Sequence, residues 1–421
     1  MKLSAVDSGF RKAARGLTRK RLRVHAVLLA VCAWSVIGAD FATPGLLDRA
    51  GNIKFQDFLQ FYISAKLIRQ GRVDQLFDQQ VAAAELQAII GQPTKVRLPT
   101  VYGPQVGLFV FGFSRLSFFA AAMLWVSVSV LAYFGCCYLV WKLCPNLRAS
   151  RSLVWAAAVA FPPFFHFVVR GQIAILILVC FVAAFFAFRS GSDFLAGLAL
   201  GSLVFKPQFL VAIPLILLGA GAWKSFAGTA IAAAGQLGAT WLYFGTAVMR
   251  AYAHTLWHIP RSLALAEPAF SQVQMHSLRS FWLLLVPWPS LSFTFYLVSS
   301  IPILALAILS WRSPGSLGLR FSVLVFAAVL VNPHLFVYDL LVLAPVLLLL
   351  TDWVVGNPSH PAADRVSVLL YLAYLLPVLG PLALLTRLQL SVLAFVALQW
   401  TLFIILRREA DHLTTDPGGA A

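Results

Sequence analysis

Residues 117–140 read SFFAAAMLWVSVSVLAYFGCCYLV and contain no charged side chain. An apolar stretch of about 20 residues matches the thickness of the hydrocarbon core of a bilayer, and a helix satisfies its own backbone hydrogen bonds there. The rest of the 421-residue chain is similar, with 60% hydrophobic and 11% charged residues and a mean hydropathy of +0.85. We therefore predict an all-α polytopic membrane protein, because a soluble domain would need more charge on its surface.

About twelve stretches of this kind run along the chain. The predicted spans are 24–44, 117–140, 151–169, 171–189, 193–206, 207–223, 225–247, 290–311, 318–332, 335–351, 365–385 and 388–406. The sixth follows the fifth almost directly, and two of the later spans are short enough to be bent. We treat 24–406 as one transmembrane domain, with a basic segment at 1–23 and a tail at 407–421.

Basic residues set the predicted topology. Residues 1–23 contain eight lysines and arginines and the single acid Asp7, so the positive-inside rule places this segment in the cytoplasm. An even number of spans returns the C-terminal tail to the same side. The net charge of +17 follows from this topology, and we expect no nucleic-acid partner. The five cysteines form no CxxC pair, so we expect no disulfide framework and no metal site.

Two outward segments, 45–116 and 248–289, are too long to be simple turns. The first contains DFLQFYISAKLIRQGRVDQLF at 57–77, whose apolar and basic residues recur at helical spacing and predict an interfacial amphipathic helix. Further on, VYGPQVGLFVFGF at 101–113 is apolar but short, so we expect it to dip into the outer leaflet. Function is expected to concentrate in these segments.

Carboxylates on the outer side are the candidates for acid–base chemistry. Orientation leaves eight of the fifteen there: Asp40, Asp48, Asp57, Asp74, Asp78, Glu85, Glu267 and Asp339. Asp57 opens the predicted interfacial helix and could act as a base. It could equally cap that helix, since an acid near a helix N-terminus satisfies free amides.

Asp339 lies a few residues inside an apolar span. His334 and Tyr338 are four residues apart, on one face if the segment is helical. Ionisable groups at membrane depth are costly and are often functional, but a structural hydrogen bond to a neighbouring helix explains Asp339 as well.

Basic side chains also mark the outer ends of spans. Lys206 ends the fifth span, and Arg170 with Gln172 lies in the turn between the third and fourth, where both cations could face an anion or merely extend to the headgroups. The first outer segment adds Arg49, Lys54, Lys66, Arg69, Arg72, Lys95, Arg97 and Arg115. An anionic outer ligand would explain this excess.

The chain has no GxxxxGK[ST] loop, GxGxxG turn, HExxH pair or GxSxG elbow. Its ordered landmarks instead resemble glycosyltransferase family 87, bacterial membrane enzymes of the GT-C class that use polyprenyl-phosphate sugars. The segments that carry the resemblance are DFLQFYISAKLIRQGRVDQLFD at 57–78, VYGPQVGLFVFGFSRLS at 101–117, RGQIAILIL at 170–178, AGLALGSLVFKPQFLVAIPLILL at 196–218, QMHSLRSFW at 274–282 and NPHLFVYDLLVLAPVL at 332–347. The chain departs from the family pattern at Phe61, Gly103 and Ala174.

The resemblance implies a GT-C-type bundle of about twelve helices whose catalytic carboxylate is Asp57, acting as general base in an inverting transfer that needs no metal or other cofactor. It implies a polyprenyl-phosphate-linked donor of a hexose such as mannose, a lipid or glycan acceptor, and a site on the outer face of the bacterial inner membrane. Binding of the donor phosphate and sugar is expected at Lys206, Arg170, Gln172, His334, Tyr62, Tyr102 and Asp339. Residues 105–113 would line the groove for the lipid tail.

Two other functions remain open from the sequence. A secondary transporter or lipid flippase would use Asp339 and His334 as a coupling pair inside the membrane. A noncatalytic membrane scaffold would need no convergence of Asp57 with Lys206. The distance between these groups in the folded chain discriminates between an enzyme and a scaffold.

Overall fold

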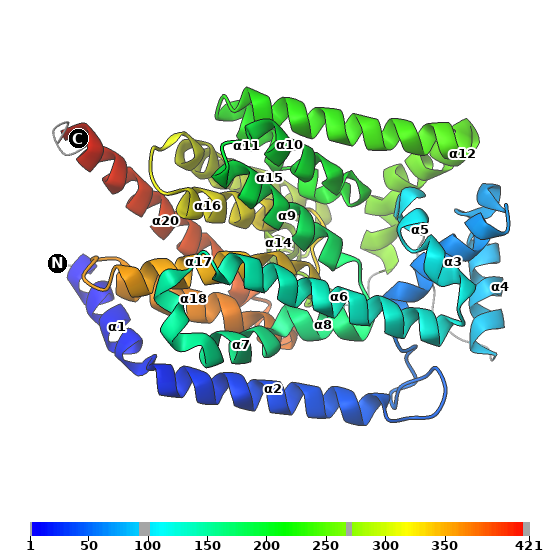
Figure 1. Cartoon of the computed structure of the whole chain (residues 1–421), viewed down its shortest axis with the longest axis horizontal. Helices are drawn as coiled ribbons and strands as arrows, with labels where there is room; N and C mark the ends of the chain where they lie inside the picture. The colour runs from blue at the N-terminus through cyan, green and yellow to red at the C-terminus, as the bar shows by residue number, and fades with distance from the viewer. Residues whose placement is uncertain (1, 92–101, 267–271, 416–421) are drawn as a thin grey trace.

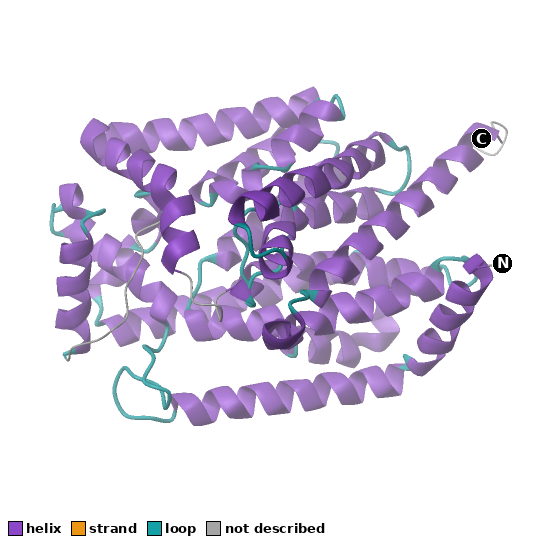
Figure 2. Ribbon diagram, turned by 180° about the vertical axis from the view of Figure 1, so that it is seen from behind, coloured by secondary structure: helices purple, strands orange, loops and turns teal. Residues whose placement is uncertain are grey.

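The computed structural model describes residues 2–91, 102–266 and 272–415, and these residues are almost entirely helical (Figure 1, Figure 2). Within them no strand forms, and the two isolated β-bridges join Leu47 to Ile53 and Met275 to Phe336. The all-α prediction is therefore confirmed for this part of the chain. Lys95, Arg97 and Glu267 lie outside the described residues.

The helices of the described residues follow one another in chain order. Those of the first half are α1 (Lys2–Gly16), α2 (Arg19–Phe41), α3 (Gln56–Arg69), η1 (Val73–Gln75), α4 (Gln79–Ile90), α5 (Gln105–Phe109), η2 (Phe111–Arg115), α6 (Phe118–Trp141), η3 (Pro145–Ser150), α7 (Arg151–Val159), α8 (Pro162–Arg170), α9 (Ala174–Arg189), α10 (Asp193–Gly201), η4 (Ser202–Phe205), η5 (Pro207–Leu210) and α11 (Ile213–Gly219). The second half contains α12 (Trp223–Ala266), α14 (Leu278–Leu285), α15 (Pro289–Arg312), α16 (Leu317–Leu330), η6 (Val337–Val342), α17 (Leu343–Gly356), α18 (Ala363–Leu375), η7 (Leu376–Leu382), α19 (Ala383–Thr386) and α20 (Leu390–Thr415).

In the described ranges, six helical segments are long and apolar enough to cross a membrane, and a bent pair would make seven. They are Arg19–Phe41, Phe118–Trp141, Pro289–Arg312, Val337–Gly356, Ala363–Thr386 and Leu390–Asp411, with Pro145–Val159 and Pro162–Arg170 as the pair bent by 44°. Each coincides with a span expected from the sequence. The number of about twelve is not confirmed, because the other expected spans form apolar helices of 10–17 residues or, for 225–247, the first part of α12.

A proline explains why two of these helices are short. Lys206 separates η4 from η5 with φ −132° and ψ 72°, outside the helical region. The ring of Pro207 disfavours the helical conformation in the residue before it and lacks the amide hydrogen that a continuous helix would need. The expected fifth and sixth spans are thus two half-helices that meet at a buried lysine.

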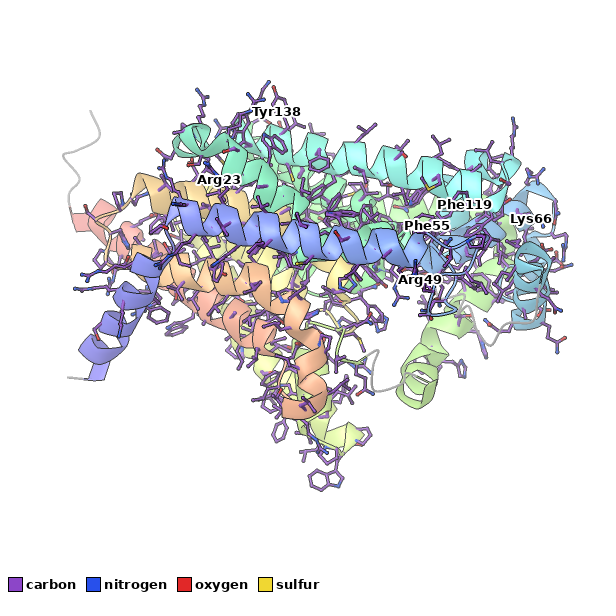
Figure 3. All side chains as sticks on the ribbon, turned by 90° about the horizontal axis from the view of Figure 1, so that it is seen from below. Arg23, Arg49, Phe55, Lys66, Phe119 and Tyr138 are labelled. Carbon is purple, nitrogen blue, oxygen red and sulfur yellow. The ribbon has the colours of Figure 1, made fainter. Side chains whose placement is uncertain are left out.

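The two ends of the bundle are formed by different segments of the chain. Both termini lie at one end, while α3, α4 and α5 form the other end (Figure 1). Figure 3 shows Arg23 near the terminal end and Arg49, Phe55 and Lys66 at the opposite end. An ion pair between Arg365 and Asp7 joins α18 to α1 at the terminal end.

Buried apolar residues concentrate around α16. Eleven of its fourteen residues are buried, so this helix is hydrophobic on all sides, as expected for a helix inside a bundle. In contrast, α2 and α12 run along the outside (Figure 1) and expose large apolar side chains such as Leu28 and Leu242. Outward apolar side chains on such long helices are typical of a protein surrounded by lipid.

The helix that carries Asp57 packs differently from the expectation. α3 buries eight residues against protein: Phe58, Leu59, Phe61, Tyr62, Ile63, Ala65, Leu67 and Ile68. It contacts α5, α6 and α8. The sequence correctly predicted a helix, but its apolar residues face protein on most sides and do not form a single face for the membrane surface.

Candidate active site

Asp57 is the second residue of α3, directly after a tight turn. Phe55 precedes the helix in the left-handed conformation, with φ 56° and ψ 39°. This conformation is unfavourable for a bulky residue, and such strain is often found at functional sites. The Phe55 ring packs edge-on against Phe41 at 5.3 Å, so packing holds the turn in place. The side chain of Asp57 is 15% exposed.

The carboxylate of Asp57 is fixed by a side chain from a distant part of the sequence. Gln172 Nε2 donates to Asp57 Oδ2 at 2.7 Å. The Gln172 amide oxygen accepts from the Ile173 amide at 3.1 Å, which directs the amino group toward Asp57. Because Phe55 occupies the N-cap position and Asp57 bonds to Gln172, the interpretation of Asp57 as a mere helix cap is not supported.

Glycine makes the approach of these two segments possible. Gly171 ends α8 with φ 65°, and a Cβ atom placed on it would lie 2.8 Å from Cβ of Phe58. A larger residue would therefore clash with α3 and would also be strained. The sequence Arg170-Gly171-Gln172 thus fits one turn against the start of α3.

Arg170 supplies positive charge beside the carboxylate. Its Nη1 atom lies 3.7 Å from Asp57 Oδ1, and its side chain is 32% exposed. At this distance the guanidinium attracts the carboxylate without forming a bidentate hydrogen bond. Arg170 therefore has room to contact another anion while it remains near Asp57.

Lys206 and Asp339 form a buried ion pair. Their side chains are 3% and 1% exposed, and Lys206 Nζ bonds to Asp339 Oδ1. Asp339 also accepts from the Phe336 amide at the start of η6. Buried charges are tolerated when they are paired in this way. This pair accounts for Asp339 structurally, and the sequence did not predict it.

Two tyrosines, Tyr102 and Tyr338, lie between the ion pair and Asp57 in the network of interactions. Lys206 Nζ lies 5.9 Å from the centre of the Tyr102 ring and 5.3 Å from that of Tyr338. Tyr102 also interacts with the Gln172 side chain, and the charge of Asp57 acts on Tyr102, Lys206 and Tyr338. Burial raises the pKa of Tyr102 against the opposing charge of Lys206, so its hydroxyl stays protonated. Residues from α3, the α8–α9 turn, the η4–η5 break and η6 therefore converge.

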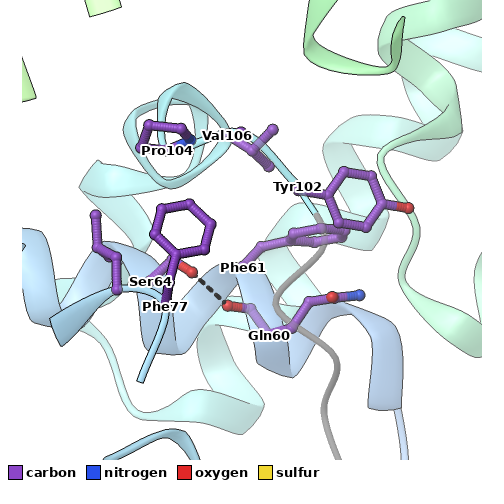
Figure 4. A pocket seen from close by; sticks show the side chains of 9 residues that line it. Gln60, Phe61, Ser64, Phe77, Tyr102, Pro104 and Val106 are labelled. Atoms are coloured by element: carbon purple, nitrogen blue, oxygen red, sulfur yellow. Dashed lines mark hydrogen bonds between the residues drawn. The ribbon is translucent and has the colours of Figure 1, made fainter. Parts of the chain in front are cut away.

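A small cavity adjoins this cluster, with a volume of about 20 Å³ (Figure 4). Gln60, Phe61 and Tyr102 are among its lining residues, and the rings of Phe61 and Tyr102 meet edge-on at 4.9 Å. Gln60 and Phe61 follow Asp57 by three and four residues, so they lie on the same face of α3. This size suits a single water molecule.

Two glutamines near the cavity were missed by the sequence reasoning. The amide oxygen of Gln60 is buried without a hydrogen-bond partner, and so are both polar atoms of the Gln105 side chain. Gln105 is only 3% exposed and begins α5, directly after Pro104. Buried amides without a hydrogen-bond partner are uncommon, and such groups can have a catalytic or binding role. The sequence offered one indication for each: Gln60 follows Asp57 by three residues, and Gln105 directly follows Gly103-Pro104.

The spacing of His334 and Tyr338 would place them on one helical face, but η6 begins only at Val337, so His334 is not in a helix with Tyr338. Both side chains instead pack on the Phe336 ring, at 4.9 Å and 5.4 Å. Burial, together with the charges of Lys206 and Arg279, lowers the pKa of His334 to about 4. At neutral pH this imidazole is therefore uncharged and can act as a hydrogen-bonding group but not as a cation.

Tyr62 has a structural partner. Its hydroxyl donates to the Leu116 carbonyl oxygen at 2.7 Å. Tyr62 follows Asp57 by five residues, which places the two side chains roughly 140° apart around the helix axis. Tyr62 is therefore not one of the residues proposed to bind the donor.

Three basic residues of the first outer segment have partners within the protein. Lys54 is buried and donates to the carbonyl oxygens of Thr43 and Gly45. Lys66 and Arg72 both pair with Glu85, at 2.9 Å and 2.7 Å. An anionic ligand is thus not needed to explain these three cations.

Most of the other outer carboxylates that the structure describes bond to the backbone and so have a structural role. Asp40 accepts a hydrogen bond from the Arg49 amide, Asp48 accepts one from the Asn52 amide, and Asp78 caps α4. Asp74 is exposed in η1. Glu85 is held by two cations at hydrogen-bonding distance, whereas Asp57 combines partial exposure and a fixed orientation with Arg170 at 3.7 Å. Among the described residues no group of three or more His, Cys, Asp or Glu side chains could hold a metal ion.

These features define a polytopic helical membrane protein with a polar cluster at the end of the bundle opposite its termini. The profile of glycosyltransferase family 87 matches residues 100–333, more than half of the chain, so the protein belongs to glycosyltransferase family 87. No curated protein and no solved structure matches the chain. The matched range contains Tyr102, Arg170, Gln172 and Lys206, whereas Asp57, His334 and Asp339 lie outside it.

Family membership makes the protein a multi-pass membrane glycosyltransferase, which uses a sugar donor and an acceptor. It therefore favours an enzyme over a transporter, a flippase or a scaffold. The ion pair between Asp339 and Lys206 also supplies a structural role for the carboxylate that a transporter would have used for coupling.

Proposed function

We propose that this enzyme transfers a hexose such as mannose from a polyprenyl-phosphate donor to a hydroxyl of a lipid or glycan acceptor. Asp57 is the general base. The cluster lies at the end of the bundle away from the termini, and the basic residues of 1–23 favour a cytoplasmic location for the terminal end. The proposed site therefore faces the outside of the bacterial inner membrane.

The proposed reaction is a single displacement with inversion. Asp57 takes the proton from the acceptor hydroxyl while that oxygen forms a bond to the anomeric carbon of the sugar. The bond between this carbon and the phosphate oxygen breaks, and its electron pair leaves with the polyprenyl phosphate. The carboxylate thereby becomes a carboxylic acid, and no metal ion is needed in this step.

Positive charge would stabilise the departing phosphate. Arg170 is the leading candidate, because it is partly exposed and lies 3.7 Å from Asp57 Oδ1. Lys206 is already paired with Asp339, so its net effect on a second anion is smaller, although its charge still acts on Tyr102. Preorganised groups of this kind stabilise the transition state when they interact with charge that develops during the reaction. Neutral His334 would contribute a hydrogen bond.

The membrane fold suits a donor with a prenyl tail, since the tail can lie among apolar helices while the sugar phosphate stays near the polar cluster. Phe109 in α5 is 40% exposed and packs edge-on against Phe205, the neighbour of Lys206. This apolar contact beside a charged residue supports the expectation that residues 105–113 line the path of the tail.

The observation that carries the proposal is the fixed geometry of Asp57 between Gln172 and Arg170. The test is transfer of radiolabelled sugar from a polyprenyl-phosphate donor by purified Asp57→Asn protein. Loss of a general base typically lowers the rate by about 10²–10⁴-fold, so we expect a loss in this range. Asp74→Asn, which changes an exposed carboxylate of the same segment, is the matched control and should keep normal activity.

Two results would contradict the proposal. Equal transfer by Asp57→Asn and the native protein would remove Asp57 as the base. Transfer by the native protein from a nucleotide sugar, with none from the polyprenyl-phosphate donor, would refute the donor class and leave family membership intact.

A further inference from the structure

A second and much larger cavity, of about 470 Å³, lies in the half of the bundle that holds the N-terminus. It is a partly open groove bounded by α1, α2, α6, α7, α17 and α18, and it shares no residue with the Asp57 cluster. Five alanines line it and leave the space open: Ala14, Ala26, Ala157, Ala158 and Ala344. Binding pockets often lie between the helices of a bundle, and a partly open apolar groove of this size is accessible to a lipid chain.

The cavity wall formed by α2 touches the rest of the bundle at separated points. Only Ala26 of this helix is buried. Near its start, His25 Nδ1 and the Tyr371 hydroxyl are 2.9 Å apart. Nearer its end, Trp34 Nε1 donates to the Val159 carbonyl oxygen at 3.1 Å. The cavity underlies the stretch of α2 from Leu22 to Leu29.

The polar groups in the wall are largely satisfied within the protein. The Tyr133 hydroxyl donates to the Ala158 carbonyl oxygen at 3.0 Å, and the Tyr374 hydroxyl donates to that of Ala157 at 2.9 Å. A cavity whose polar groups already have partners offers little to water and favours an apolar occupant. Its volume falls in the range of pockets that bind small apolar molecules.

The depth of the cavity matches one leaflet of a bilayer. Its lining runs along α18 from Asp364 to Leu375 and along α17 from Ala344 to Val355. Each stretch spans eleven helical rises of about 1.5 Å, which correspond to roughly 16 Å. The hydrocarbon core of a bilayer is about 30 Å thick, so one leaflet contributes about half of it. A cavity of this depth can hold one chain of a lipid from the leaflet on the terminal side.

The mouth of the cavity is basic. Arg19 lines it at the start of α2, and the exposed residues Lys20, Arg21 and Arg23 follow directly. The single acidic lining residue, Asp364, lies on the opposite wall. A surplus of basic side chains at the membrane surface attracts anionic headgroups, and basic pockets between transmembrane helices bind them.

From this geometry we infer that the cavity binds a phospholipid with an anionic headgroup. One acyl chain lies between α2 and α18, and the phosphate lies at Arg19. The lipid completes the packing of α2 against the bundle and is not the donor or the acceptor of the transfer reaction.

Native mass spectrometry of the full-length protein in detergent tests this inference, with phosphatidylglycerol as the anionic probe and phosphatidylcholine as the zwitterionic probe. We expect the native protein to retain one phosphatidylglycerol per chain in preference to phosphatidylcholine. Ala26→Phe fills the cavity and should reduce the retained lipid at least tenfold, whereas Val27→Phe changes the next residue, which is outside the cavity lining, and should retain it. Arg19→Gln should weaken phosphatidylglycerol binding about fivefold. Lys224→Gln, which changes an exposed lysine outside the cavity lining, serves as its control.

A second filling variant guards against misfolding. Ser367→Phe enters the cavity from α18 and should repeat the loss if Ala26→Phe does not yield a monodisperse protein. Equal lipid retention by a folded filling variant and Val27→Phe would overturn the inference. Equal binding of both phospholipids, or preferential displacement of phosphatidylglycerol by polyprenyl phosphate, would also overturn it. These readouts do not depend on sugar transfer, so they are separate from the test of Asp57.

Discussion

Gln172 Nε2 donates a 2.7 Å hydrogen bond to Asp57 Oδ2 across a sequence separation of 115 residues. Gln172 is 1% exposed and its amide oxygen is held by the Ile173 amide, so it cannot easily turn away. A buried amide of this kind orients a carboxylate without neutralising its charge. Gln172 is therefore a positioning residue for the proposed base.

Replacing Gln172 should impair turnover more than folding. Gln172→Leu removes a hydrogen bond to a charged group, which is worth about 1.5–3 kcal/mol, and we expect kcat to fall roughly 10- to 100-fold. Gln172→Glu would place a second carboxylate next to Asp57 and should move the acidic limb of the pH–rate profile to higher pH. Gln80→Leu, at an exposed position of α4, is the control. An unchanged pH profile for Gln172→Glu would contradict the positioning role.

The ion pair between Lys206 and Asp339 allows structure and catalysis to be separated. Lys206→Met leaves a buried carboxylate unpaired and should cost about 3–5 kcal/mol of unfolding free energy. The double variant Lys206→Met/Asp339→Leu removes both charges and should recover most of this loss in a thermal unfolding measurement. If Lys206 also contacts the donor, the double variant stays poorly active although it is stable. Native activity in the double variant would exclude that contact.

Gln105 offers a test of an unpaired buried amide. Gln105→Leu removes two polar atoms that lack partners, so we expect the thermal stability to rise or stay constant. If the amide binds a substrate hydroxyl, KM rises or kcat falls at least tenfold in the same variant. A stable variant with unchanged kinetics would show that Gln105 has no role in substrate binding. Leu108→Met, in the same short helix, is a conservative control.

Glu85 should stabilise the contact between α3 and α4 in a pH-dependent way. Burial opposes its ionisation, but hydrogen bonds and charges from Lys66 and Arg72 outweigh this effect and lower its pKa below the usual value of 4.5. The folded state therefore releases this proton more readily than the unfolded state, so the stabilisation is present above pH 4.5 and is lost as pH falls through the native pKa.

Glu85→Gln should accordingly reduce the unfolding free energy by about 1 kcal/mol at pH 7 and by less near pH 4. Unfolding followed by circular dichroism at both pH values measures the difference. A pH-independent effect would show that the ion pairs do not contribute, and Asp74→Asn should have no effect at either pH.

The sequence predicted the long apolar helices well because their apolarity is continuous. The expected span 117–140 became α6, Phe118–Trp141, within one residue at each end. Where apolar residues surround a helix, composition does not distinguish lipid from protein as the neighbour. The buried residues Phe58, Phe61 and Ile63 in α3 illustrate this, since the same residues suit a membrane surface.

Long-range pairing was harder to predict. Asp57 and Gln172 were both noted from their positions in the sequence, and the family resemblance then implied their roles, but no spacing rule indicates that they bond to each other. Lys206 and Asp339 were each considered alone, although two charges buried in one apolar bundle are expected to pair. The sequence could not predict that the Gln105 amide is unpaired, because the lack of a partner is recognised only in the folded structure.

The order of the contributing segments has a consequence for biogenesis. Asp57 is synthesised early, and its partner Gln172 follows 115 residues later. Lys206 is synthesised after Gln172, and its partner Asp339 follows Lys206 by 133 residues. Chains emerge from the ribosome N-terminus first. A nascent chain that has inserted only its first helices therefore carries the carboxylate without its partners, and catalytic competence becomes one of the last properties that the growing enzyme acquires.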